Sequence, residues 1–194
     1  MIQYKINSLI LKDSFKPHGM IKDDLLELIN KSNDKSWLKK DSYFNDDLAK
    51  TDWPLADDWE RDWTKRYRGL FLDKFKEFAN TLGYKNIQLS KLWYQQYGLK
   101  QTHGWHVHAR NYTGVYYLEL PKDSPHTEFI YPNDLNKGFT IEVKEGDMVF
   151  FPCNFMHRSK PSLSKKTKTI ISWNLDFEDI LDKHIGEKES IVTL

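Results

Sequence analysis

The sequence of 194 residues contains a single cysteine, Cys153, so an intrachain disulfide cannot form. This excludes a disulfide-stabilised secreted scaffold and a cysteine-rich zinc site, and it is typical of a protein from a reducing cytoplasm. Long hydrophobic runs are missing too, because no stretch approaches the roughly 18 apolar residues of a membrane span. The first residues also lack the pattern of a secretory signal. We therefore expect a soluble, cytoplasmic protein without a membrane partner.

An excess of charge of one sign is likewise missing, since 29 lysines and arginines stand against 28 aspartates and glutamates. This balance gives no overall attraction to nucleic acid or to an anionic membrane, so we expect neither as a partner. The length suits one hydrophobic core, and we expect a single domain over residues 1–194. Aromatic residues make up 14% of the sequence, which favours an aromatic-rich core or pocket.

The first half of the chain predicts a short strand followed by two helices. Residues 1–12 alternate loosely, which favours the opening strand. Met20–Ser32 then places its isoleucines and leucines on one face, as an amphipathic helix does. A longer helix with an aromatic stripe is predicted from an N-cap at Asp57 or Asp58 to Gly83, which suits the left-handed position after a helix.

The regions around these helices show other patterns. Residues 33–54 are polar and irregular, and they either pack over the core or cover a substrate. Their isolated aromatic residues are Trp37, Tyr43, Phe44 and Trp53. Beyond Tyr84 short β-branched and aromatic runs, separated by turn residues, predict a barrel or sandwich. The predicted strands are Ile87–Tyr97, the strand that carries His106 and His108, Gly114–Leu120, Thr127–Tyr131, Phe139–Val143, Asp147–Phe151 and Lys168–Leu175. A short helix is predicted after residue 177.

Histidines at two of these strands predict a metal site. The segment W-H-V-H places His106 and His108 at positions i and i+2, where strand side chains project from one face about 7 Å apart. They can coordinate one metal ion from one face of the strand, while Val107 packs behind them on the opposite face. His157, in the loop after the strand G-D-M-V-F-F-P, would complete a facial set of three ligands. The histidines do not by themselves choose among iron, zinc, copper and nickel.

A second row of residues suggests an anionic ligand for the same site. Along the last predicted strand, Lys168, Ile170, Ser172 and Asn174 share one face by alternation. If this face points into the cavity that holds the histidines, Lys168 places a cation near the metal. The alternative without a function is that Lys168 is a solvated lysine in the K-K-T-K cluster.

These motifs together resemble the 2-oxoglutarate- and iron(II)-dependent oxygenases of the double-stranded β-helix fold, and within them the prolyl-hydroxylase-like branch. Five pieces in order carry the resemblance: Y-G followed by H-x-H, G-V-Y-Y-L, G-D-x-V-F-F-P, His157, and K-x-x-x-S-W-N. The resemblance implies an α+β, mainly β fold. Residues 85–177 would form the jelly-roll or cupin-like core, residues 1–84 a helical N-terminal support that buttresses it, and residues 178–194 a C-terminal tail.

The resemblance also implies roles for individual histidines. It makes His106 and His157 metal ligands and sets His108 where most of these enzymes have Asp or Glu. Three neutral imidazoles leave iron its full +2 charge, while three coordination positions stay open. A branch of uncharacterised bacterial and phage oxygenases is similar in its H-x-H motif. His103, three residues before His106, is an alternative to His108 as the third ligand.

The cofactor residues follow from the same resemblance. Lys168 falls where the family keeps an Arg or Lys for the distal carboxylate of 2-oxoglutarate. Tyr117 matches a tyrosine that assists it, and Ser172 a hydroxyl beside it. Tyr97 matches a tyrosine near the metal-chelating end of 2-oxoglutarate.

The expected function is therefore that of an Fe(II)- and 2-oxoglutarate-dependent dioxygenase, a hydroxylase of an amino-acid, peptidyl or small-molecule substrate. The alternative is a cupin-like metal-binding protein that does not use 2-oxoglutarate. The cupin pattern usually has a glutamate four or five residues after H-x-H, and here Tyr112 and Thr113 stand there instead. Neither the substrate nor the oligomeric state follows from the sequence.

Overall fold

The computed structural model describes residues 8–34, 37–39, 46–132 and 134–180 of the chain. Its helices are α1 (His18–Lys31), α2 (Asp62–Thr81) and the short 3-10 helix η1 (Trp53–Leu55). The strands before the first histidine motif are β1 (Leu11–Ser14), β2 (Trp37–Lys39), β3 (Asp46–Leu48), β4 (Lys50–Thr51) and β5 (Tyr84–Tyr97). The later strands are β6 (His103–His106), β7 (Tyr112–Glu119), β8 (Thr127–Tyr131), β9 (Asp134–Thr140), β10 (Asp147–Pro152), β11 (His157–Ser159) and β12 (Lys168–Ile180).

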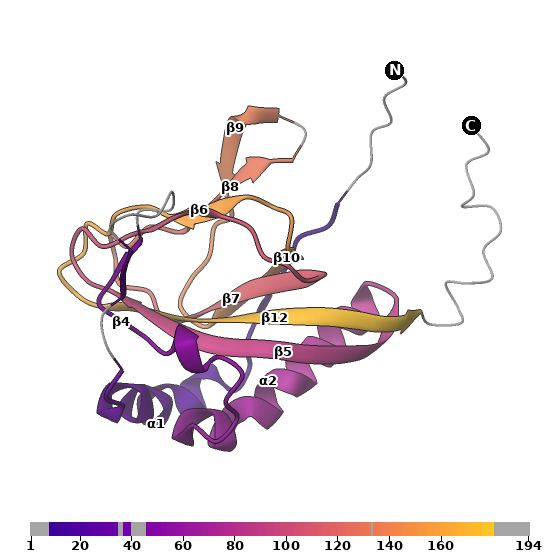
Figure 1. Cartoon of the computed structure of the whole chain (residues 1–194), viewed down its shortest axis with the longest axis horizontal. Coiled ribbons are helices and arrows are strands. Elements are labelled where there is room, and N and C mark those ends of the chain that lie inside the picture. The colour runs from indigo at the N-terminus through magenta and orange to yellow at the C-terminus, as the bar shows by residue number, and fades with distance from the viewer. Residues whose placement is uncertain (1–7, 35–36, 40–45, 133, 181–194) are drawn as a thin grey trace.

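Two antiparallel sheets face each other across the molecule (Figure 1). The larger sheet has the order β1-β10-β7-β12-β5-β4, and the smaller one has the order β6-β11-β8-β9. A two-stranded ribbon of β2 and β3 lies apart from both. Apart from the β4-β5 and β8-β9 pairs, neighbours within each sheet are distant in the sequence, so the chain crosses repeatedly between the two layers, as in a jelly roll. The expected mainly β architecture is present.

The helices cover the outer face of the larger sheet. In Figure 1, α1 and α2 lie below β5 and β12, on the side away from the smaller sheet. The aromatic stripe of α2 supplies Phe75 and Phe78, whose ring centroids lie 4.6 Å from Trp173 and 3.7 Å from Phe150, respectively. A Cβ on Gly114 would come within 2.3 Å of the Trp173 ring, so only glycine fits here. The predicted buttress is thus a dense aromatic layer.

Helix α2 begins later than the sequence predicts. Neither Asp57 nor Asp58 is its N-cap, because the helix starts at Asp62 after Arg61. The Asp58 side chain instead accepts a hydrogen bond from the Glu60 N–H and holds a turn before the helix. The Arg61 side chain extends toward β5 instead. Its guanidinium donates a hydrogen bond to Leu92 O at 2.7 Å and pairs with a buried carboxylate on the preceding segment. The predicted C-terminus is confirmed, with Gly83 at φ +89°.

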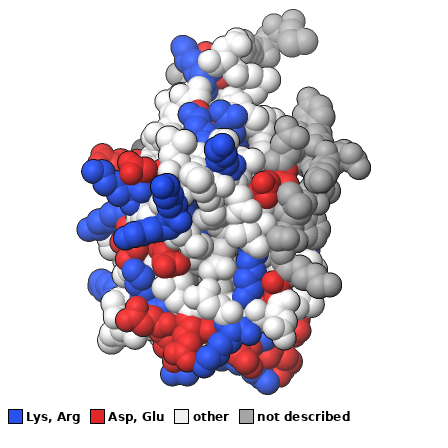
Figure 2. All heavy atoms as spheres, turned by 90° about the vertical axis from the view of Figure 1, so that its left-hand side faces the viewer, with Lys and Arg blue, Asp and Glu red and all other residues white. Residues whose placement is uncertain are grey.

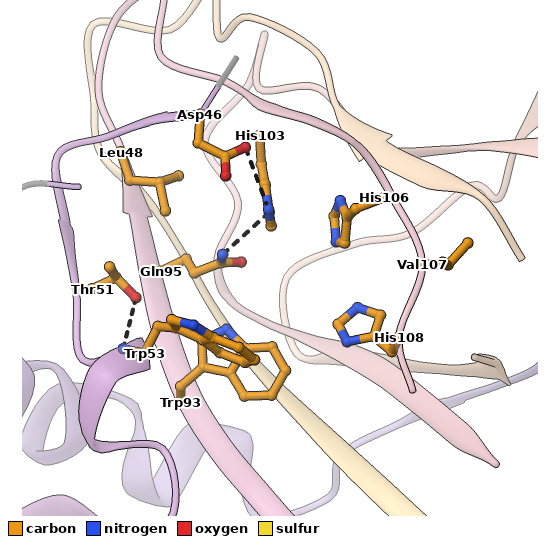
Figure 3. A pocket seen from close by; sticks show the side chains of 10 residues that line it. All are labelled: Asp46, Leu48, Thr51, Trp53, Trp93, Gln95, His103, His106, Val107 and His108. Atoms are coloured by element: carbon orange, nitrogen blue, oxygen red, sulfur yellow. Dashed lines mark hydrogen bonds and ion pairs between the residues drawn. The ribbon is translucent and has the colours of Figure 1, made fainter. Parts of the chain in front are cut away.

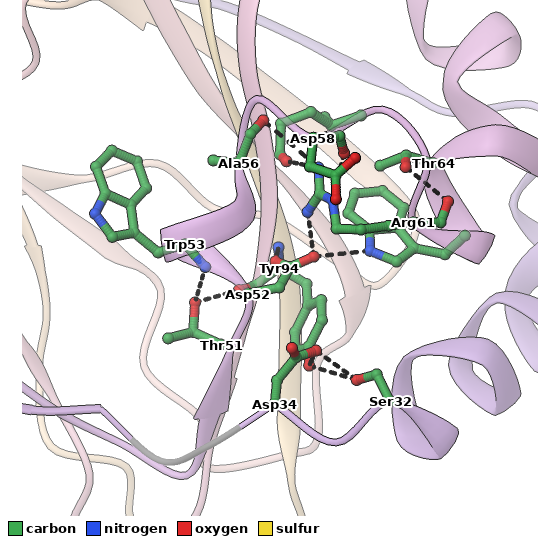
Figure 4. Close-up of polar contacts among 12 residues, drawn as sticks. Ser32, Asp34, Thr51, Asp52, Trp53, Ala56, Asp58, Arg61, Thr64 and Tyr94 are labelled. Atoms are coloured by element: carbon green, nitrogen blue, oxygen red, sulfur yellow. Dashed lines mark hydrogen bonds and ion pairs between the residues drawn. The ribbon is translucent and has the colours of Figure 1, made fainter.

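That buried carboxylate is Asp52, which fixes the segment between β4 and α2 (Figure 4). Its side chain pairs with Arg61 and accepts hydrogen bonds from Trp63 Nε1 and Tyr94 N, each at 2.8 Å. Next to it, Thr51 Oγ1 donates to Tyr94 O at 2.7 Å and accepts from Trp53 N at 3.1 Å. Trp53 is therefore held against β5 by polar contacts on both sides.

Several other boundaries differ from the predictions. The opening strand, predicted over residues 1–12, begins only at Leu11, and residues 1–7 lie outside the described part. The predicted strand Phe139–Val143 is shifted, since β9 covers residues 134–140 by pairing with β8. In place of an irregular loop, the described part of residues 33–54 carries short strands and η1. The helix predicted after residue 177 is not formed over residues 178–180, which continue β12, and residues 181–194 lie outside the described chain.

Surface charge follows the balanced composition. Figure 2 shows lysines and arginines side by side with aspartates and glutamates on the face at the left of Figure 1. Among the described residues, none of the helices is both long enough and apolar enough to span a bilayer.

Candidate functional site

Three histidines converge between the two sheets. His106 ends β6 and His157 opens β11, and the two residues pair directly in the antiparallel register. His108 follows β6, where its backbone N–H donates to Cys153 O at 2.9 Å. One ligand atom from each imidazole lies within 4.8 Å of the others, so this cluster could hold a metal ion.

The histidine pair reaches this geometry differently from the prediction. A continuous strand should turn Val107 away from the pair into the core, but Val107 is 52% exposed. The reason is that β6 ends at His106, and the chain then leaves the strand to bond with the loop at Cys153. The convergence of His106 and His108 therefore rests on that loop contact, and the prediction that Val107 packs behind them is wrong.

The hydrogen bonds of the imidazoles leave their Nε2 atoms facing the centre of the cluster. His106 Nδ1 and His157 Nδ1 bond to the carbonyl oxygens of Gly104 at 2.8 Å and Phe155 at 2.9 Å. These are N–H donors, so the neutral rings keep a lone pair on Nε2. The Nε2 atoms of His108 and His157 lie 3.3 Å apart, and nitrogens that share a metal at right angles lie roughly 3 Å apart.

Burial keeps these imidazoles neutral. It lowers the pKa of His157 well below the ordinary value and lowers that of His106 as well. Burial, together with His106, brings the pKa of His108 down to about 3, although the Asn174 side chain opposes the shift. Asn174 Oδ1 is itself buried without a hydrogen-bond partner in the described part of the chain. Neutral imidazoles present lone pairs, which is the state that a metal requires.

The predicted inner row of β12 points into the same space. Lys168 is 1% exposed, and its Nζ donates to Pro125 O at 2.7 Å and to Ser159 Oγ at 3.2 Å. Within the described ranges no carboxylate forms an ion pair with it. Burial therefore lowers the pKa of Lys168 to about 7. Lys168 is therefore buried, and the alternative interpretation as a solvated lysine is wrong.

The other residues predicted for the cofactor surround Lys168 to different degrees. Lys168 Nζ lies 5.1 Å from the ring centroid of Tyr97 and 5.9 Å from that of Tyr117. Tyr97 and Ser172 line the cavity that joins Lys168 to the histidines. Tyr117 stands behind that lining and bonds to Thr127 Oγ1 at 2.8 Å. Burial raises the pKa of both tyrosines, so both keep their hydroxyl protons.

A wider cavity of ≈ 200 Å³ adjoins the histidines on the other side (Figure 3). Trp93 and Gln95 line both cavities, and the sequence analysis missed them. Their signal was present, since they precede Tyr97 by four and two residues on one strand and therefore share its face. Trp53 also lines the wider cavity. Tyr43 and Phe44, proposed with it as a cover, lie outside the described residues, as does the Trp37 side chain.

His103 lies beside the cluster as part of a polar chain. Its ring stacks on His106 with centroids 3.9 Å apart. Tyr97 Oη donates to Gln95 Oε1 at 3.1 Å, and Gln95 Nε2 lies 3.2 Å from His103 Nδ1. His103 Nε2 then lies 3.5 Å from Asp46 Oδ1. Both ring nitrogens of His103 thus have partners. In contrast, His106, His108 and His157 each bring one ring nitrogen to a common centre.

Known proteins were compared with the chain at three levels. No protein-family model and no curated protein sequence matches it. Solved structures do. A 2OG-Fe(II) oxygenase family oxidoreductase from Burkholderia pseudomallei superposes with a TM-score of 0.70 at 11% identity, over 91% of this chain and 88% of that one.

Two prolyl hydroxylases show the same likeness. The viral collagen prolyl hydroxylase of Paramecium Bursaria Chlorella virus-1, in its 2OG complex, gives a TM-score of 0.60 at 15% identity, over 86% of this chain and 94% of that one. A Trichoplax adhaerens prolyl hydroxylase, in complex with a hypoxia inducible factor peptide, gives a TM-score of 0.61 at 17% identity, over 88% of this chain and 83% of that one. At identities this low, the superpositions establish a shared fold alone. The chain therefore has the double-stranded β-helix fold of the 2-oxoglutarate and iron(II) oxygenases, as the sequence resemblance implied.

Proposed function

We propose that this protein is an Fe(II)- and 2-oxoglutarate-dependent oxygenase that hydroxylates an amino-acid, peptidyl or small-molecule substrate. One observation carries the proposal. A fully buried lysine without a carboxylate partner among the described residues shares a cavity with three neutral, converging imidazoles. A cupin-like metal protein that does not use 2-oxoglutarate has no need of that cation, whose burial costs stability.

The residues fit a ferrous ion. His106, His108 and His157 would hold it through Nε2 atoms, and the Gly104 and Phe155 carbonyls would fix the first and last of these rings in orientation. Such a facial set keeps one side of the metal open to ligands. When bound, the ion supplies the chemistry by which oxygen oxidises 2-oxoglutarate to succinate and carbon dioxide and oxidises a C–H bond of the substrate.

The residues also fit 2-oxoglutarate. Lys168 would bind the distal carboxylate through a charge-assisted contact in a dry environment, with Tyr97 and Ser172 along the chain of the cofactor. A narrow cavity runs from Lys168 to the histidines. Two negative charges on 2-oxoglutarate would balance the +2 charge that three neutral imidazoles leave on the ion. We place this reaction in the cytoplasm, where the thiol of Cys153 stays reduced.

The test is succinate release from 2-oxoglutarate by the Fe(II)-loaded protein in air. We expect slow release without any further substrate, its loss in His157→Ala, and in Lys168→Met a need for about 10- to 100-fold more 2-oxoglutarate. Lys166→Met is the matched control, because Lys166 is exposed two residues before Lys168 on the same segment and should release succinate as the unaltered protein does. An unaltered protein that binds iron but forms no succinate, with or without candidate substrates, would overturn the proposal.

A further inference from the structure

The ≈ 200 Å³ cavity opens on the proposed metal centre and has the position of a substrate site. Trp93, Gln95, His103, His106 and His108 line both this cavity and the narrower one that leads to Lys168. A group inside it would therefore lie against the same imidazoles as the cofactor. The volume is below the roughly 300–1,000 Å³ of sites for drug-sized ligands. It suits a single side chain or a metabolite of similar size.

One wall of this cavity is aromatic. The rings of Trp53 and Trp93 meet edge to face, with centroids 4.5 Å apart and an interplanar angle of 78°. Figure 3 shows both indoles on one side of the space, with His106 and His108 along another. Lys91 Nζ already lies 4.4 Å from the centroid of the Trp53 ring, so this indole accepts an ammonium group on its face. The wall itself offers apolar contact to the carbon chain of a ligand.

The opposite wall carries negative charge. In Figure 3, Asp46 and His103 lie across the cavity from the indoles. The Asp46 side chain is only 9% exposed, accepts a hydrogen bond from the Gly104 N–H at 3.1 Å and lies beside His103. Asp46 thus already has partners, and what matters is the sign of its charge. The described lining residues include neither lysine nor arginine, so an anion would find no opposite charge there.

We infer that the substrate of the proposed oxygenase carries an amine or guanidine on a short aliphatic chain. The cation would lie at Asp46, and its carbon chain would cross Trp53 and Trp93 toward the metal centre. This inference rests on the proposed function. The reaction balances as R–H + O₂ + 2-oxoglutarate giving R–OH + succinate + CO₂. One oxygen atom enters succinate and the other enters the alcohol, while 2-oxoglutarate and the C–H bond each give up two electrons.

The experiment compares chains that differ only in charge. Succinate release is measured with L-lysine, with L-norleucine, which lacks the terminal ammonium, and with L-2-aminoadipate, which ends in a carboxylate. L-Arginine and 1,5-diaminopentane extend the cationic set, and a blocked lysyl peptide separates a peptidyl source from a free amino acid. We expect at least one cation to stimulate release about 10-fold or more over norleucine, with aminoadipate below both, because a charge-assisted contact is worth that factor.

Variants then locate the effect. Asp46→Asn should raise KM for the stimulating cation about 10- to 100-fold and change kcat less, because the lost contact binds the part of the substrate remote from the metal. Asp47→Asn is the matched control, because the Asp47 carboxylate accepts a hydrogen bond from Gln101 and does not line the cavity. Thermal denaturation checks that both variants fold.

The outcomes separate the inference from the proposed function. If slow succinate release occurs but no cation, free or peptidyl, stimulates it more than norleucine does, the inference fails and the oxygenase stands. Equal KM values for the stimulating cation in Asp46→Asn and Asp47→Asn would also overturn the inference. If no succinate forms under any condition with iron bound, the proposed function fails, and the inference fails with it.

Discussion

The two faces of strand β12 are equally buried but differ in chemistry. Its first eight residues are all buried, and they alternate between the helices on one side and the cavity on the other. The outward row is Thr169, Ile171, Trp173 and Leu175, of which the last three belong to the aromatic and aliphatic core under α2. The inward row is Lys168, Ile170, Ser172 and Asn174, in which every residue but one is polar or charged.

This difference separates residues kept for stability from residues kept for a ligand. Burying an apolar side chain stabilises the fold, whereas burying an amine without a carboxylate partner costs free energy. In the described part of the chain Lys168 has hydrogen bonds but no carboxylate partner, and Asn174 Oδ1 has no hydrogen-bond partner. Substitutions in the two rows should therefore have opposite signatures.

The largest effect is expected in the outward row. Trp173 is fully buried, with ring centroids 4.6 Å from Phe75 and 4.7 Å from Phe150. Trp173→Ala should lower the free energy of unfolding by about 3–5 kcal/mol because it leaves a large cavity in a packed layer. Urea denaturation measures this, and Trp173→Phe serves if the alanine variant does not fold. A loss below about 1 kcal/mol would contradict the assignment of this face to stability.

Lys168→Met should give the opposite signature. Removing the buried amine should leave the free energy of unfolding at pH 6 unchanged or higher, since a lysine whose pKa is lowered by burial destabilises the folded state. The same change should weaken 2-oxoglutarate binding about 10- to 100-fold. Calorimetric titration of the metal-loaded protein measures the binding. A variant that loses stability but binds 2-oxoglutarate normally would reverse the assignment of the inward face.

The pH dependence of Lys168 sharpens the comparison further. Its pKa is about 7 in the folded protein against an ordinary 10.5, so between these values the unfolded chain binds more protons. This group therefore makes stability rise with pH from about 7 to 10.5 and contributes no slope below 7. Binding of a carboxylate requires the protonated amine. At pH 8.5, 2-oxoglutarate should therefore bind with net uptake of protons.

Calorimetry in buffers of different ionisation enthalpy measures this uptake. The metal-loaded protein should take up protons at pH 8.5 and almost none at pH 6, where the amine is already charged. Lys168→Arg should bind 2-oxoglutarate without proton uptake at either pH, because arginine stays protonated. Equal proton uptake by the arginine variant and the unaltered protein would assign the proton to another group.

Ser172→Ala is the smallest change expected to register. Ser172 lies in the inward row beside the path from Lys168 to the histidines, and it carries no charge. Its removal should change the free energy of unfolding by less than about 1 kcal/mol and weaken 2-oxoglutarate binding about 2- to 10-fold, as for one neutral hydrogen bond. Denaturation and titration of this variant complete the series. A stability loss as large as that of Trp173→Ala would mean that both faces serve the fold alike.

Periodicity predicted much of this arrangement. Alternation from Lys168 to Asn174 gave the inward row, and the 3.6-residue spacing of the α2 aromatics gave the layer that covers the sheet. These patterns work because a strand or a helix sets side-chain direction locally. The order of motifs then brought His106 and His157 together, and the strand register pairs them.

Other features depend on contacts that no local pattern encodes. His108 reaches the cluster because the chain leaves β6 and bonds to the loop at Cys153, 45 positions away in the sequence. Helix α2 starts after Arg61, whose guanidinium pairs with the distant Asp52, and not after the predicted caps Asp57 or Asp58. Trp53 and Asp46, on opposite walls of the wider cavity, belong to a segment without periodicity, so their places beside the histidines followed only from the structure.

We propose above all that the cavity between the two sheets binds a metal ion at the histidines and 2-oxoglutarate at Lys168 together. Anaerobic addition of Fe(II) and then 2-oxoglutarate tests it most directly, because a 2-oxoglutarate chelated to ferrous iron gives a visible metal-to-ligand charge-transfer band. We predict that the band appears in the unaltered protein, is absent in His157→Ala, and in Lys168→Met requires about 10- to 100-fold more 2-oxoglutarate. Bound iron with no band at saturating 2-oxoglutarate would contradict the account.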